Sequence, residues 1–179
     1  MDANHERSIT AHHEAGHFVA ELVLKPSSVL GTVSIVSDDE TLGRCTAEAV
    51  ELWDEFLPDA KLIEAEVVCL LAGHAADRRF EPSEEREQIS IERASSDFEK
   101  ARRFCDYLGI EMDVFHKKAN QFVDDHWGEI TCLARALLIE NTLCADEASI
   151  WIDVVTKNEQ LTSFHLEVFP KLKRLLESF

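Results

Sequence analysis

The chain has 179 residues, and 45% of them are hydrophobic, so it can build one domain with a sizeable core. Acidic residues number 35 and basic residues 18, which gives a formal net charge of −17. A surface this negative repels phosphate backbones and anionic lipid headgroups. We therefore expect neither nucleic acid nor membrane among the partners.

The predicted elements make the chain mostly α with a small β element, an α+β class. Helical spacing of apolar residues predicts helices over 9–24, 58–80, 95–108, 113–141, 146–156 and 164–179. Ser8 is the expected N-cap of the first helix, and Gly128 is a candidate break in the fourth. Alternating residues predict a hairpin or small meander with strands at 32–36 and 43–50, joined by a polar turn at 37–40.

The charged segment 81–93 contains Pro82 and is expected to be a surface loop. Residues 1–156 are expected to form one domain, and 157–179 a C-terminal amphipathic helix. This helix either packs on the same domain or contacts a partner, including a second copy of the chain.

The N-terminus lacks the basic and apolar regions of a secretory signal, and no apolar stretch is long enough for a membrane helix. The five cysteines are scattered and include no C-x-x-C pair. Cys69, Cys105 and Cys132 lie in apolar helical contexts and are expected to be reduced, buried thiols. These features favour a cytoplasmic protein.

The strongest local signal is His13-Glu14-Ala15-Gly16-His17, an H-E-x-x-H inside the first predicted helix. Residues four apart share one face of a helix, so the imidazoles of His13 and His17 can both reach one zinc ion. Glu14 lies beside them and can take a proton from a metal-bound water. Gly16 leaves room for another segment to approach, and His12 points about 100° away from His13 as a wall or surface residue.

A catalytic zinc site also needs a third protein ligand and an open position. The residues after His17 do not continue an H-E-x-x-H-x-x-G-x-x-H pattern, so that ligand comes from elsewhere. The candidates by chemistry are His74, Asp77, Asp97, Glu99 and His116, and spacing alone does not choose among them.

The segment from Thr10 to His17 reads Thr-Ala-His-His-Glu-Ala-Gly-His and resembles the active-site helix of the FtsH-type zinc protease domain. Further segments resemble that family in collinear order, at 32–36 with 42–43, 70–77, 94–101 and 133–143. The resemblance covers roughly residues 8–152 and implies a zincin-like helical peptidase fold. The chain departs from the family pattern at His12, at Ala72 and His74 in the glycine-rich helix, at Asp77, and at Ser95 and Ser96.

Carried over residue by residue, the resemblance implies that His13, His17 and Asp97 bind zinc and that Glu14 is the general base. Without the resemblance, Asp97 alone is typical of a helix-capping carboxylate. The segment at 32–36 would be an edge strand that aligns an extended peptide by backbone pairing. The residues expected to bind substrate are therefore Thr32, Val33, Ser34, Ile35 and Val36.

Members of this family usually carry an AAA+ ATPase before the protease domain, but here the motif begins at residue 13 and the chain contains no P-loop. We therefore expect a stand-alone, ATP-independent zinc peptidase that acts on short or unfolded polypeptides. The acidic surface would favour basic or neutral peptides. Two rival hypotheses are a zinc-binding regulatory or interaction module that has lost proteolysis, and a metal-free helical domain with a chance motif.

Overall fold

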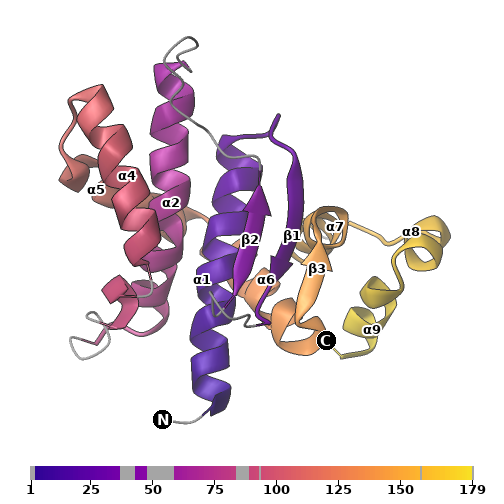
Figure 1. Cartoon of the computed structure of the whole chain (residues 1–179). Helices are drawn as coiled ribbons and strands as arrows, with labels where there is room; N and C mark the ends of the chain where they lie inside the picture. Colours follow the sequence, from indigo (N-terminus) through magenta and orange to yellow (C-terminus); the bar gives the residue numbers. More distant parts are fainter. Residues whose placement is uncertain are drawn as a thin grey trace.

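The computed structural model describes residues 3–36, 43–47, 59–83, 89–92, 94–157 and 159–178. The protein is mostly α-helical with one small antiparallel sheet, as the sequence predicted. Its helices are α1 (Ala3–Leu24), α2 (Ala60–Phe80), α4 (Ser95–Leu108), α5 (Met112–Asp125), α6 (Trp127–Glu140), α7 (Ala145–Thr156), α8 (Ser163–Val168) and α9 (Pro170–Ser178). The strands are β1 (Leu30–Ser34), β2 (Arg44–Ala47) and β3 (Thr142–Cys144). Helix α1 runs through the middle, with α2, α4 and α5 on one side and the sheet on the other (Figure 1).

The antiparallel pair α1 and α2 forms the centre of the core, because small residues let the two helices approach closely (Figure 1). Ala15 of α1 and Ala72 and Ala76 of α2 are fully buried. A Cβ atom on Gly16 would lie only 2.7 Å from the carbonyl oxygen of Ala72. The prediction that Gly16 admits a second segment is therefore confirmed, and α2 is that segment.

The sheet has the order β2-β1-β3, so β1 is its central strand. Val33 of β1 is paired with Cys45 of β2 on one side and with Leu143 of β3 on the other. The backbone N–H of Ile35 also donates to the carbonyl of Asn141, at 2.8 Å. The prediction of an edge strand at 32–36 is therefore wrong, because a three-residue strand after α6 occupies that edge. Val33 and Ser34 are paired on both sides, and the backbone of Thr32 pairs with Cys144 on one side and bonds the Thr46 hydroxyl on the other, so these residues have no free edge for a substrate. Ile35 and Val36 lie beyond the end of β1.

The helix boundaries follow the predictions with a few differences. Helix α1 begins at Ala3, so Ser8 is not its N-cap but lies inside it, with its hydroxyl donating to the carbonyl of Asn4. The long helix predicted over 113–141 breaks at His126, two residues before Gly128. The C-cap Gly109 ends α4 with a φ of 65°, as expected for the residue that stops that helix.

The C-terminal segment forms two helices, not the single helix predicted over 164–179. Pro170 cannot donate a backbone hydrogen bond, so it ends α8 and begins α9. Helix α9 packs on the same core as the rest of the chain, and its Leu172 and Leu175 are fully buried. Arg174 donates two hydrogen bonds of 2.7 Å to the carboxylate of Glu140 on α6.

The segment 81–93 is not simply a surface loop. Residues 81–83 are outside any helix, but 89–92 form a helical turn in which Ser90 is buried. Residues 84–88 and 93 lie outside the described residues, as do the predicted turn at 37–40, the end of the predicted second strand at 48–50, and Pro58.

A buried ion cluster holds the end of α1. The ammonium group of Lys25 lies 2.9 Å from Oε2 of Glu21 and 2.5 Å from Oε2 of Glu66 on α2. All three residues are buried. Burial alone would lower the pKa of Lys25, but its hydrogen bonds to the two glutamates raise it, so the Lys25 ammonium group stays protonated.

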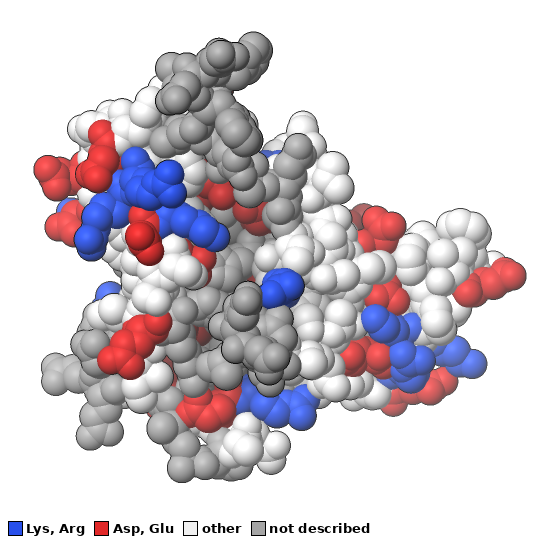
Figure 2. Space-filling model, in the orientation of Figure 1, with Lys and Arg blue, Asp and Glu red and all other residues white. Residues whose placement is uncertain are grey.

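The face in Figure 2 carries clusters of basic side chains as well as acidic ones. On the face shown, Lys and Arg side chains gather over α4, where Lys100, Arg102 and Arg103 are exposed. No helix in the described part of the chain is both long and apolar enough to cross a membrane. All five cysteines are free.

Candidate metal centre

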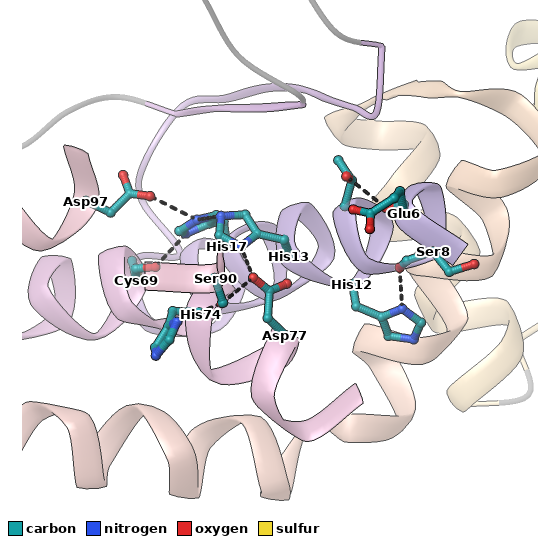
Figure 3. A network of polar contacts seen from close by, with 11 residues as sticks. Glu6, Ser8, His12, His13, His17, Cys69, His74, Asp77, Ser90 and Asp97 are labelled. Carbon is teal, nitrogen blue, oxygen red and sulfur yellow. Dashed lines mark hydrogen bonds and ion pairs between the residues drawn. The ribbon is translucent and has the colours of Figure 1, made fainter. Parts of the chain in front are cut away.

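His13, His17 and Asp97 converge at the junction of α1 and α4. One ligand atom from each lies within 4.8 Å of the other two. The Nε2 atoms of the two histidines are 3.1 Å apart, and Nε2 of His17 is 3.5 Å from Oδ2 of Asp97. The two imidazoles leave α1 on the same face, and Asp97 approaches His17 from the first turn of α4 (Figure 3). The structure thus brings together the three residues that the resemblance implied.

The outer nitrogen of each imidazole has a fixed partner. Nδ1 of His13 lies 2.9 Å from Oδ2 of Asp77, and Nδ1 of His17 lies 2.8 Å from the carbonyl oxygen of Cys69. A carbonyl and a carboxylate can only accept, so each Nδ1 carries a proton and donates it. In the neutral imidazoles both Nε2 atoms then carry a bare lone pair, and both lie within 4.8 Å of the ligand oxygen of Asp97.

This donor set fits a metal ion. Two bare imidazole nitrogens and a carboxylate oxygen repel one another at these distances unless a cation lies between them. They are also the ligand types that zinc prefers, and an outer partner on each histidine is typical of zinc sites.

Without a metal ion, a proton can take the same place. Burial alone would lower the pKa of His17, but the carboxylate of Asp97 more than offsets this and raises it to about 9. Burial acts the same way on His13, and the charge and hydrogen bond of Asp77 raise its pKa as well. Burial would raise the pKa of Asp97, but contact with His17 lowers it. The site therefore has a strong preference for a positive charge at its centre.

Glu14 is buried beside these ligands, at 7% exposed. Burial raises the pKa of its carboxyl group, while the charges of His13 and His17 oppose that rise. A Cβ atom on Gly43 would lie 2.7 Å from Oε1 of Glu14 and 2.9 Å from the carbonyl of Ser34. The backbone just before β2 therefore touches the Glu14 carboxylate, and only glycine leaves it room.

A second glycine makes room for a ligand. A Cβ atom on Gly73 of α2 would collide with the imidazole ring of His17. Gly73 and Asp77 are one turn apart on α2, and they face His17 and His13, which are one turn apart on α1. This matched spacing of four residues is the signal in the sequence that could have linked α2 to the site.

The other candidates for the third ligand lie outside the cluster. Asp77 contacts the outer nitrogen of His13 rather than the inner one. His74 is buried and contacts the Ser90 hydroxyl, and Glu99 is exposed. His116 packs against the ring of Phe98.

His12 is a buried residue, which agrees with the first of the two predicted alternatives, a wall residue or a surface residue. It is 5% exposed, stacks on the ring of Phe80 with centroids 4.0 Å apart, and faces Trp127 at 5.4 Å. Its Nδ1 donates to the carbonyl of Ser8, at 2.7 Å. Burial lowers the pKa of His12, so it packs as a neutral ring.

A scan of the chain against protein-family models gives no match, and a search of curated proteins gives no match either. The FtsH-type protease domain therefore remains a resemblance in the sequence motifs alone.

Proposed function

We propose that the chain is a zinc-dependent metallopeptidase of the FtsH type, with a zincin-like fold, that hydrolyses peptide bonds in short or unfolded polypeptides. The observation that carries this proposal is the cluster of two bare imidazole nitrogens and the Asp97 carboxylate, with a buried glutamate beside it. A chance H-E-x-x-H has no reason to meet a third ligand and an outer partner on each histidine.

His13, His17 and Asp97 would hold the zinc ion. The bound ion would acidify a coordinated water and polarise the peptide carbonyl. Glu14 is the general base: it takes one proton of the attacking water and returns it to the amine nitrogen of the leaving group. Its raised pKa suits both steps, because a group that must accept and then donate a proton works best with a pKa near the working pH.

The substrate would lie along β2 rather than β1. Strand β2 is at an edge of the sheet, and among the described residues no strand pairs with its outer side. Gly43, directly before β2, touches Glu14, so a peptide that extends this edge would pass close to the base. Only an extended backbone can pair with a strand edge, which favours short or unfolded substrates over folded ones.

The test is Glu14→Gln, which keeps the shape of the side chain and removes the base. Zinc-loaded wild type should cleave casein or a fluorogenic peptide library, and the variant should be about 10²–10⁴-fold slower with an unchanged zinc content. Metal analysis with His13→Ala as the control tests the site itself.

Zinc binding without any Glu14-dependent cleavage would refute the enzyme and favour the regulatory module. Absence of stoichiometric zinc in the wild type would refute both and leave a helical domain with a chance motif.

A further inference from the structure

Behind His13 lies a chain of buried polar groups that the catalytic proposal does not use. Oδ2 of Asp77 contacts Nδ1 of His13 at 2.9 Å and accepts a hydrogen bond of 2.8 Å from the hydroxyl of Ser90. The same hydroxyl oxygen lies 2.9 Å from Nδ1 of His74 (Figure 3). Asp77, Ser90 and His74 are between 4% and 6% exposed, so water does not substitute for these contacts.

The direction of each hydrogen bond among His13, Asp77, Ser90 and His74 is determined. Ser90 has one hydroxyl proton and gives it to Asp77, so its oxygen accepts from Nδ1–H of His74. Asp77 accepts from both sides, from Ser90 and from Nδ1–H of His13. The four groups therefore fix one tautomer of His13, the tautomer that leaves Nε2 bare and directed at the metal centre.

Asp77 depends on these donors because its other oxygen has none. Oδ1 of Asp77 is buried and has no hydrogen-bond partner in the described structure. Without the Ser90 hydroxyl, a buried carboxylate would keep a single donor, and the Nδ1–H of His74 would lose its acceptor. Buried polar groups in such networks are costly to leave unpaired.

The same residues also contact the helix that carries the third ligand. The ring of His74 packs edge-on against Phe98, the residue after Asp97, with centroids 4.9 Å apart. The carbonyl of Ser90 accepts from the backbone N–H of Ala94, the residue before α4. Ser90 and His74 thus contact both the partner of His13 and the start of the helix that carries Asp97.

We propose that Ser90 and His74 are positioning residues of the metal centre: they orient Asp77, which sets the tautomer and angle of His13, and they fix the first turn of α4 against α2. This inference rests on the proposed metal site and adds to it a hydrogen-bond network that orients one of its ligands. The helical turn at 89–92 was expected to be part of a surface loop, but it supplies the Ser90 hydroxyl that links His74 to Asp77.

The experiment measures zinc affinity by competition with a chromogenic chelator. Ser90→Ala should bind zinc about 10–100-fold more weakly than wild type, the usual effect of removing an outer-shell partner. Thr156→Val is the matched control, because it removes one hydroxyl hydrogen bond, to the carbonyl of Ile152 in α7, far from the centre. It should leave the affinity unchanged.

A double-mutant cycle separates positioning from general destabilisation. If Ser90 acts through Asp77, Ser90→Ala should cost little further affinity once Asp77→Asn is present. Additive losses, or a Ser90→Ala protein that binds zinc as tightly as wild type, would overturn the proposal.

A readout on the metal-free protein keeps this test independent of the proposed activity. Long-range ¹H–¹⁵N spectra of the histidine rings should show His74 protonated at Nδ1 in wild type and at Nε2 in Ser90→Ala, because its acceptor is gone. His74 unchanged by Ser90→Ala would overturn the relay even if the protein is a zinc peptidase. The expected switch in a protein that binds no zinc would refute the proposed function but not the hydrogen-bond chain.

Discussion

Gly43→Ala should disable the base without disturbing the metal centre. The added Cβ would lie 2.7 Å from Oε1 and 2.8 Å from Cγ of Glu14, and 2.9 Å from the carbonyl oxygen of Ser34. Ordinary contact for a Cβ begins near 3.4 Å, so the Glu14 carboxylate must move by several tenths of an ångström to about 1 Å. A misplacement of that size can cost about 10²-fold in rate, less than complete removal of the base.

The assay compares kcat/KM on a fluorogenic peptide with the zinc content of the same samples. We expect a loss of about 10–100-fold for Gly43→Ala with full zinc occupancy, because Gly43 meets Glu14 and not the ligands. Gly128→Ala is the matched control, since a Cβ there meets nothing within 4 Å. Full activity of Gly43→Ala would show that Glu14 does not need its present position and would refute the reasoning. If Gly43→Ala lost zinc as well as activity, the claim that Gly43 affects only Glu14 and not the zinc ligands would be refuted.

Four further outcomes follow from the structure. Gly73→Ala should have the opposite phenotype, loss of zinc in chelator competition, because its Cβ would displace the ring of His17. Lys25→Met should lower the free energy of unfolding in urea by about 3–5 kcal/mol, because it leaves two buried glutamates unpaired. Arg174→Gln should lower Tm at pH 7, because the hydrogen bond from Arg174 lowers the pKa of Glu140 below its usual value of 4.5. The stabilisation is present above about pH 4.5 and is lost as the pH falls through the lowered pKa, so the Tm values of the two proteins should converge in acid. Basic peptides should be cleaved faster than acidic ones at low salt because the net charge is −17, and the reverse order would indicate that the cations of α4 act locally.

The parts of the site that follow from local periodicity could be predicted from the sequence. The face shared by His13 and His17, with Glu14 beside them, depends only on the pitch of one helix. Asp97 came from the family resemblance, since spacing alone left five candidates. The roles of Asp77 and Ser90 depend on how α2 packs against α1, and a residue pattern within one helix does not contain that register.

The errors in the predicted fold have local physical causes. Strand β3 has only three residues, too few for an alternating pattern, and its position beside β1 is set by the packing of α6 and α7. The edge position of 32–36 was implied by the family resemblance, and with β3 missed nothing in the sequence placed a strand on its second side. In the C-terminal segment the apolar spacing continues through Pro170, but the missing N–H of proline decides where the helix divides.

Two departures from the FtsH-type pattern belong to one network. His74 and Asp77 stand where that pattern has Arg and Glu, and they lie three residues apart on the same face of α2. The Ser90 hydroxyl connects them, accepting from His74 and donating to Asp77. An arginine at 74 would bring a charge next to the partly buried ring of Phe98, and a longer carboxylate at 77 would move the partner of His13. The Ser90 hydroxyl therefore couples His74 to Asp77, so the side chains at positions 74 and 77 both bear on the outer partner of His13.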